Sequence, residues 1–136
     1  MSEMPSQPEM GEAEWSDDCE CLHPSAVMAA RRAIADSPPD ELATTFAILG
    51  DPTRMRVLVA LGTSELCVTD LAAATGVNRT TISHQLRVLR QHRLVRRRRD
   101  GKVVYYAVDD EHVTSLVQMV AEHLAETRAD ENRASA

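Results

Sequence analysis

The sequence contains few aromatic residues and no long apolar segment. Aromatic side chains account for 3% of its 136 residues (one Trp, two Tyr and one Phe), so a core must be built from aliphatic side chains, which favours helices packed through apolar faces. No apolar run approaches the roughly 20 residues that cross a bilayer, and the N-terminus lacks the basic and then apolar pattern of a signal peptide. We therefore expect one small, mainly helical domain in the cytoplasm, with no membrane partner.

Cysteine is scarce as well. The chain has three cysteines, and a small, odd number in a chain expected in the cytoplasm argues against a disulfide framework. Metal binding or redox chemistry is the better expectation for these thiols.

Charge of both signs is present, but it is segregated along the chain. The formal net charge is −6, which by itself argues against a nucleic-acid partner. Between Arg79 and Lys102, however, nine Lys or Arg stand against a single acid, Asp100, so this segment carries +8 and the rest of the chain −14. Because a partner responds to the charge of a local surface, the basic segment indicates binding to nucleic acid.

Composition divides the chain into three parts. Residues 1–22 carry seven acids, two prolines and no Lys or Arg, which predicts an acidic, flexible arm. Residues 23–127 hold the periodic apolar segments of a folded domain, with helices expected over 25–35, 41–49, a stretch that follows Asp51, 66–75, 79–91 and a long segment from Asp109. Residues 128–136 are polar and predict a disordered tail.

Two short helices joined by a tight turn are expected over residues 66–91. Gly76 supplies a left-handed turn residue, and Asn78 can cap the second helix. The next segment, Leu94–Val108, has two β-prone halves around Asp100-Gly101, which is a strong hairpin signal. The order of helix-turn-helix, basic hairpin and final helix predicts a mainly α fold with a β-hairpin wing, the winged helix-turn-helix.

The second helix of this motif has the composition of a DNA recognition helix. Ile82, Leu86 and Leu89 are spaced to face inward, which leaves polar and basic side chains on the remaining surface. On the hairpin, strand alternation directs two of four consecutive arginines toward DNA. A charge run alone is more often a solvated face, but three independent signals coincide here and favour double-stranded operator DNA as a partner. The candidate DNA-binding residues are Arg79, Thr80, Thr81, Ser83, His84, Gln85, Arg87, Arg97, Arg99 and Lys102.

The final helix carries four residues of types that bind zinc: Asp110, His112, His123 and Glu126. A rise of ~1.5 Å per residue separates His112 from His123 by roughly 16 Å, so one helix cannot bring both to one ion. If two copies pack antiparallel about a two-fold axis, Asp110 and His112 of one chain face His123 and Glu126 of the other. The contact of this homodimer would be the apolar stripe Val113, Leu116, Val117, Val120 and Leu124. The alternative is an amphipathic helix with an ordinary polar surface.

A second group of candidate ligands includes the thiols. Cys19, Cys21 and His23 lie close together in the sequence, and Cys67 and Asp70 lie one helical turn apart. Thiolates select soft or borderline ions such as zinc, cadmium or lead, and the two clusters together could complete a ligand shell. A lone Cys67 would more often be a small buried hydrophobe, but the second cluster favours ligation.

Four segments resemble the ArsR/SmtB family of metal-sensing winged-helix repressors: "LGDPTRMRVLVAL" (49–61), "ELCVTDLA" (65–72), "TISHQLRVLR" (81–90) and "GKVVYYAV" (101–108). The resemblance covers about residues 39–126. It implies a homodimer that represses genes for metal efflux or sequestration and leaves its operator when metal binds. It also implies that the four donors of the last helix form a zinc site, and that Cys67 and Asp70 join an N-terminal Cys or His of the other subunit.

Two departures from the family pattern bear on the metal. Thr69 stands where some cadmium and lead sensors have a second helix cysteine, and the pair Cys19 and Cys21 leaves open which N-terminal thiol ligates. These departures favour Zn²⁺, with Cd²⁺ or Pb²⁺ as alternatives at the thiolate site. A redox-sensing repressor that oxidises Cys19, Cys21 or Cys67 is an alternative function. A metal-buffering protein or a zinc enzyme is more remote, because an enzyme needs an open coordination position.

Overall fold

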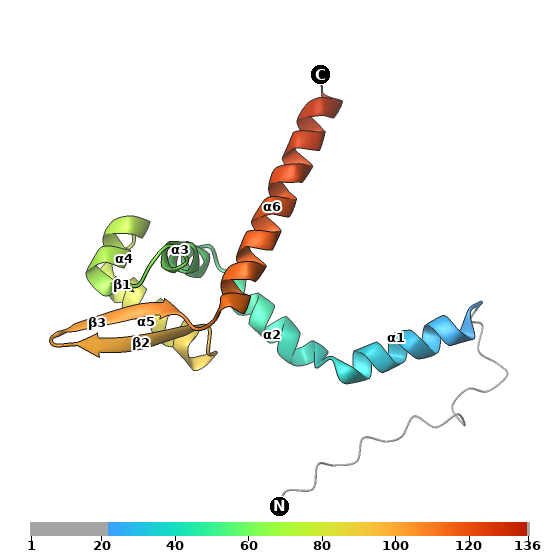
Figure 1. Cartoon of the computed structure of the whole chain (residues 1–136), viewed down its shortest axis with the longest axis horizontal. Helices are drawn as coiled ribbons and strands as arrows, with labels where there is room; N and C mark the ends of the chain where they lie inside the picture. The colour runs from blue at the N-terminus through green and yellow to red at the C-terminus, as the bar shows by residue number, and fades with distance from the viewer. Residues whose placement is uncertain (1–21, 136) are drawn as a thin grey trace, which may run out of the picture. The chain divides into compact units, whose positions relative to one another are not determined.

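The computed structural model describes residues 22–135, and the chain falls into two compact units, 1–39 and 40–136. The described residues form six helices and three short strands (Figure 1). These are α1 (Pro24–Asp36), α2 (Pro39–Leu49), α3 (Pro52–Leu61), β1 (Leu66–Cys67), α4 (Val68–Thr75), α5 (Arg79–Gln91), β2 (Val95–Asp100), β3 (Val103–Val108) and α6 (Glu111–Ala134). None of these six helices is long and apolar enough to cross a membrane.

The helix expected over 25–35 is present as α1. Pro24 occupies its first turn, where the missing N–H leaves no hydrogen bond unmade, and Ser37 follows its end, donating its N–H to the carbonyl of Ala33 at 3.0 Å. No α1 residue is buried, and the apolar side chains of Met28 and Ile34 are exposed. A helix of this length without packing is only marginally stable by itself.

The second unit is built around an aliphatic core that α2 to α5 and the start of β2 contribute to, and its fully buried side chains come from three helices. Val57 of α3, Leu71 of α4 and Ile82, Leu86 and Leu89 of α5 are the largest side chains that are fully buried. Each such side chain stabilises the fold by roughly 1.5–3 kcal/mol through its removal from water. The core therefore holds α5 by its buried face, and the other face of the helix is directed to solvent.

Side-chain caps begin two of these helices. The carboxylate of Asp51 accepts the N–H of Arg54 at 3.0 Å at the start of α3, and Asn78 accepts the N–H of Thr81 at 2.8 Å at the start of α5. Such caps typically stabilise a helix by ~1 kcal/mol. Gly76, with φ of 73°, follows α4 in the left-handed conformation that a tight turn requires. The turn and the second helix thus lie where the sequence predicts them.

The first helix of the motif begins later than predicted. Leu66 and Cys67, expected in that helix, instead form β1, which pairs antiparallel with β3 opposite Tyr106 and Tyr105. A two-residue strand depends on the backbone of a distant partner, and local periodicity does not reveal that pairing. Helix α4 therefore starts at Val68, and Cys67 occupies the position before it without a side-chain capping bond.

The predicted hairpin is confirmed as β2 and β3, in a sheet with strand order β1-β3-β2. The turn lies one residue later than the predicted Asp100-Gly101: Asp100 pairs with Val103, so the turn consists of Gly101 and Lys102, and Gly101 has the positive φ of 61° that glycine tolerates. This wing follows α5 and precedes α6 along the chain (Figure 1). The order of elements is that of a winged helix-turn-helix, and the predicted fold class is confirmed.

Helix α6 extends further than the sequence predicts. In place of a disordered tail over residues 128–136, the structure continues the helix through Ala134. Arg133 lies 3.5 Å from Asp130 one turn earlier, and Ala, Glu and Arg, which dominate this stretch, are good helix formers. Polar composition alone does not distinguish a solvated helix from a disordered tail.

Candidate DNA interface and metal-binding residues

The outward face of α5 carries polar and basic side chains. Ile82, Leu86 and Leu89 are buried on its inner face, as predicted. Hydroxyl, imidazole and guanidinium groups on the outer surface can bond to base edges and phosphates. The exposed predicted DNA-binding residues of this surface are Thr80, Ser83, His84 and Arg87.

Three other residues predicted to bind DNA lie on the flanks of α5 and bond within the chain. Arg79 donates from Nη2 to the hydroxyl of Thr69 on α4 at 2.7 Å. Thr81 is half-buried, and its N–H bonds to the cap of the helix. Gln85 is also half-buried, and its Oε1 accepts a hydrogen bond from Nε of Arg54 on α3 at 2.7 Å. The contacts of Arg79 and Gln85 tie the recognition helix to α4 and α3.

Two of the four arginines on β2 are held by contacts within the chain. Arg96 donates from Nη1 to the carbonyl oxygen of Asp109 at 3.2 Å. Arg98 donates from Nε to the carboxylate of Glu65 at 2.7 Å, and its guanidinium lies 4.6 Å from the centroid of the Tyr105 ring. Both contacts are on the strand face that Arg96 and Arg98 share.

The other two arginines, Arg97 and Arg99, point to the opposite strand face. Both are exposed, as is Lys102 in the turn at the tip of the wing. All four arginines are exposed, and the alternation divides them into two pairs on opposite strand faces; that one pair faces DNA stays a prediction. A basic strand face next to a recognition helix provides charges for phosphate contacts.

At the N-terminus of α6, Asp110 and His112 lie together. Oδ1 of Asp110 accepts the backbone N–H of His112 at 2.8 Å and that of Val113 at 3.4 Å, and lies 3.3 Å from Nδ1 of the His112 ring. Slight desolvation, which raises the pKa of Asp110, is outweighed by these backbone hydrogen bonds and by the His112 ring, so its pKa lies below the ordinary value. Asp110 is therefore a helix cap and an ionised carboxylate beside an imidazole.

The other two donors of α6 are farther along the helix. His123 and Glu126 are exposed and one turn apart, and the rise of ~1.5 Å per residue puts them well beyond the reach of Asp110 and His112. Among residues 22–135, no three Cys, His, Asp or Glu side chains come together as a metal site. One described chain therefore holds two separate pairs of candidate ligands, each with one imidazole and one carboxylate.

Only the first half of the predicted apolar stripe on α6 packs against the core. Val113 and Leu116 are half-buried there, whereas Met119, Val120 and Leu124 are exposed. No residue of α6 is fully buried. The second half of the helix thus presents apolar side chains near His123.

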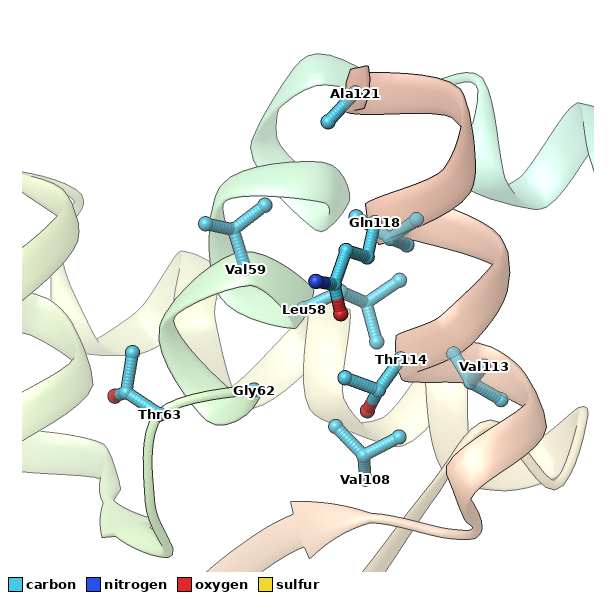
Figure 2. A pocket seen from close by; sticks show the side chains of 10 residues that line it. Leu58, Val59, Gly62, Thr63, Val108, Val113, Thr114, Gln118 and Ala121 are labelled. Carbon is cyan, nitrogen blue, oxygen red and sulfur yellow. The ribbon is translucent and has the colours of Figure 1, made fainter. Parts of the chain in front are cut away.

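Two apolar hollows lie along the junction of α3 and α6. In the first, Thr114 and Gln118 on α6 face α3 (Figure 2). The second lies against α2 and is lined by Phe46, Leu49, Gly50, Met55, Val59, Leu116, Val117, Val120, Ala121 and Leu124. The side chain of Phe46 is 54% exposed, so α2 and α6 together present an apolar groove.

The thiolate candidates are only partly within the described residues. Cys67 is half-buried at the N-terminus of α4, and Asp70 is exposed in the first turn of that helix. His23 is exposed and precedes α1, where its side chain makes no capping bond. Cys19 and Cys21 lie outside the described residues. The structure therefore presents the Cys67 half of this candidate site.

Arg54 and Glu65 bond to residues of the candidate DNA interface, and no sequence motif indicated either of them. Each contacts a basic or polar residue more than thirty positions away, Arg54 with Gln85 and Glu65 with Arg98. No local motif links residues at such separations. Their contacts follow only from the fold, which packs α3 against α5 and puts β1 and β2 on either side of β3.

Comparison with known proteins identifies relatives of this chain. Residues 51–97 match the family described as "Bacterial regulatory protein, arsR family". The chain is 51% identical over 87 residues to a transcriptional repressor SmtB homolog from Synechocystis sp., covering 64% of this chain and 66% of that protein. It is 37% identical over 113 residues to a cadmium resistance transcriptional regulatory protein CadC homolog from Staphylococcus aureus, covering 81% and 93%. A similar solved structure is a homodimeric winged helix-turn-helix DNA-binding domain from Mycobacterium bovis, with a TM-score of 0.59, 34% identity and coverage of 64% and 81%.

Proposed function

The chain belongs to the ArsR family of bacterial regulatory proteins, and from that premise we propose that it is a metal-responsive transcriptional repressor. As a homodimer it binds double-stranded operator DNA in the cytoplasm. It leaves the operator when zinc binds, with cadmium or lead as the alternative metals. The genes that it controls serve metal efflux or sequestration, and its activity is binding, without a catalytic step.

DNA binding rests on the outward face of α5 and the outward face of the wing. His84 and Arg87 are exposed on a helix whose other face is fully buried, and a helix so fixed can enter a major groove. Arg97, Arg99 and Lys102 provide the phosphate contacts beside it. The segment that carries these residues has a formal charge of +8, which outweighs the acidic average of the chain.

Dimerisation rests on the exposed apolar surface of α6. Val120 and Leu124 are each 49% exposed, and Met119 is 64% exposed. Apolar side chains repeated along one helix are typical of a surface that a second helix covers. A two-fold dimer also matches the two-fold symmetry of operator half-sites.

The observation that carries the regulatory proposal is the division of four donors between the two ends of α6. Asp110 and His112 are 3.3 Å apart at one end, and His123 and Glu126 are one turn apart at the other. Two imidazoles and two carboxylates suit Zn²⁺, so a pair of chains in antiparallel contact would hold two zinc ions. Bound zinc supplies a cross-link between the subunits.

Within this site, each residue has a role that the chain itself supports. Asp110 is oriented by the backbone N–H groups of His112 and Val113, which accounts for one of its two oxygens and leaves the other for ligation. His123 has a second ring nitrogen that can bond to neighbouring structure, and such outer bonds orient a ligand and transmit its position.

The thiolate residues form a second candidate site. Cys67 and Asp70 would join Cys19, Cys21 or His23 of the other subunit. Thiolate ligands favour cadmium or lead over harder ions, so this site is the alternative inducing site for those metals.

Release of DNA requires two forms of the dimer. One form places the two recognition helices in successive major grooves, and the other does not. A ligand shifts this equilibrium only through its different affinities for the two forms, and couplings of ~1–3 kcal/mol correspond to changes of roughly 5–150-fold in DNA affinity.

The decisive experiment titrates zinc, cadmium and lead into the complex of the protein with a duplex that the wild-type protein has selected from a random pool. Fluorescence anisotropy follows DNA release, and ultraviolet absorption follows thiolate-to-metal bonds. We expect zinc to release the DNA without a thiolate band. If cadmium releases the DNA with a thiolate-to-metal absorption band and zinc does not release it, the cysteine site is the inducing site.

The variant His123→Ala tests the residue assignment. It should bind the selected duplex as the wild type does and lose release by zinc, because one of the four ligands is missing. If the variant still leaves the DNA at wild-type zinc concentrations, the α6 site is not the inducing site. Release by peroxide and not by any metal would instead identify a redox sensor.

A further inference from the structure

Gln85 lies on the flank of α5 that faces α3. It follows Ile82 by three residues and precedes Leu86, both of which are fully buried, so the helical repeat directs it beside the inner face. Its side chain is half-buried, and Oε1 accepts the 2.7 Å hydrogen bond from Nε of Arg54. The amide is thus anchored on α3, away from the outward face that His84 and Arg87 occupy.

Arg54 connects this bond to a third helix. Its Nη1 donates to the carbonyl oxygen of Ile48 at 3.3 Å, next to the last residue of α2, where helix carbonyls lack partners within the helix. Its own backbone N–H donates to the carboxylate of Asp51 at 3.0 Å. One half-buried arginine therefore joins the end of α2, the first turn of α3 and the middle of α5.

We propose that Arg54 and Gln85 form a clamp that positions the recognition helix, and that neither side chain reads a base. The clamp depends on one part of the proposed function, namely that α5 enters the operator. It differs from the expectation that Gln85 is a DNA contact. A positioning residue affects every operator sequence equally, whereas a base contact sets the preference at one base pair.

A double-mutant cycle of Arg54→Met and Gln85→Met tests the clamp with the duplex selected by the wild-type protein. Each single variant should bind about tenfold more weakly, because a hydrogen bond to a charged group is lost. The double variant should bind about as well as Arg54→Met, because Gln85→Met removes only a bond that Arg54→Met has already removed, while Arg54→Met also loses the bond to Ile48. Across a panel of single base-pair substitutions in the duplex, the order of preference should remain that of the wild type.

The variant Gln85→Glu provides a sharper test, because it keeps an oxygen that accepts from Arg54 and loses the amide donor. It should bind more tightly than Gln85→Met, although its charge repels phosphate. Gln91→Glu and Gln91→Met, at an exposed position of the same helix, measure the effects of charge and side chain alone. The difference in affinity between Gln91→Glu and Gln91→Met is subtracted from that between Gln85→Glu and Gln85→Met. If Gln85→Glu then still binds DNA more weakly than Gln85→Met, the clamp is overturned.

The clamp is also tested without DNA. Thermal unfolding is measured for the wild type, Arg54→Met, Gln85→Met and the double variant. The loss in Tm of the double variant should be smaller than the sum of the losses of the two single variants. Additive losses in both unfolding and DNA binding would overturn the clamp, as would a changed preference at one base pair in Gln85→Met. If the wild-type protein selects no duplex, the proposed function fails, and the unfolding cycle still decides the clamp.

Discussion

The α5–wing region and helix α6 differ in what a single chain completes. The recognition helix has a buried inner face, a capped start and an exposed basic surface beside the wing, all within one chain. Helix α6 has no fully buried residue, exposes Met119, Val120 and Leu124, and holds its candidate ligands in two separated pairs. The α5–wing region is complete within one chain, whereas α6 has an exposed apolar surface that a second chain could cover.

Under the proposed function, this difference accounts for the way in which zinc would change DNA affinity. If the zinc ligands come from two chains, zinc can act on DNA affinity only by changing how the two chains are arranged. The DNA-reading surface itself needs no change, because its shape is set by the core of each chain. Variants that affect the dimer should therefore have larger effects than variants within the reading surface.

The largest effect is expected from a charge placed in the exposed apolar surface of α6. Val120→Glu should convert the dimer into a monomer and weaken binding to the selected duplex at least about a hundredfold, because the two half-sites are no longer held together. Analytical ultracentrifugation and anisotropy measure the two effects. Ala125→Glu adds the same charge at an exposed position of the same helix and should leave both unchanged. A dimeric Val120→Glu with full DNA affinity would place the dimer contact elsewhere.

An intermediate effect is expected from Asp110→Asn, which separates the two roles of this residue. Asn caps helices about as well as Asp, so the Tm should stay close to that of the wild type, but zinc affinity should fall at least about tenfold because a charged ligand is lost. Glu111→Gln removes the same charge from the neighbouring residue and is the control for isothermal titration with zinc. Equal zinc affinities in the two variants would mean that Asp110 is a cap only.

The smallest effect is expected within the wing, where Arg97 and Arg98 can be compared. Arg97→Ala should weaken DNA binding severalfold and reduce the slope of log affinity against log salt by about 0.9, the value for one phosphate contact. Arg98→Ala should change this slope less, because Arg98 is already paired with Glu65 at 2.7 Å. Anisotropy titrations over a range of salt concentrations measure both slopes. The reverse order would show that Arg98 leaves Glu65 to bind phosphate.

The sequence predicted those parts of the molecule that depend on local patterns. The inner face of α5 followed from the spacing of Ile82, Leu86 and Leu89, and its start followed from Asn78, because helical periodicity and capping involve residues a few positions apart. The hairpin followed from its turn and from β-prone residues on both sides. These are the features that the structure confirms.

The parts that the sequence did not predict depend on distant partners. Strand β1 exists because β3 pairs with Leu66 and Cys67, and the bond between Arg54 and Gln85 requires α3 and α5 to be packed first. The extension of α6 to Ala134 was missed for another reason, since a polar helix and a polar tail have similar compositions. For the candidate metal site, spacing indicated that one helix was insufficient, and the arrangement of a second chain stays a prediction.

A mixed dimer tests whether each inducing zinc site takes ligands from both chains. One chain carries His112→Ala and the other His123→Ala, and the two are purified together through different affinity tags. In an antiparallel dimer, both losses fall in the same site and the other site keeps all four ligands. We expect that neither variant alone binds zinc tightly, and that the mixed dimer binds one zinc ion with wild-type affinity. A mixed dimer that binds no zinc tightly would contradict a site shared in this way.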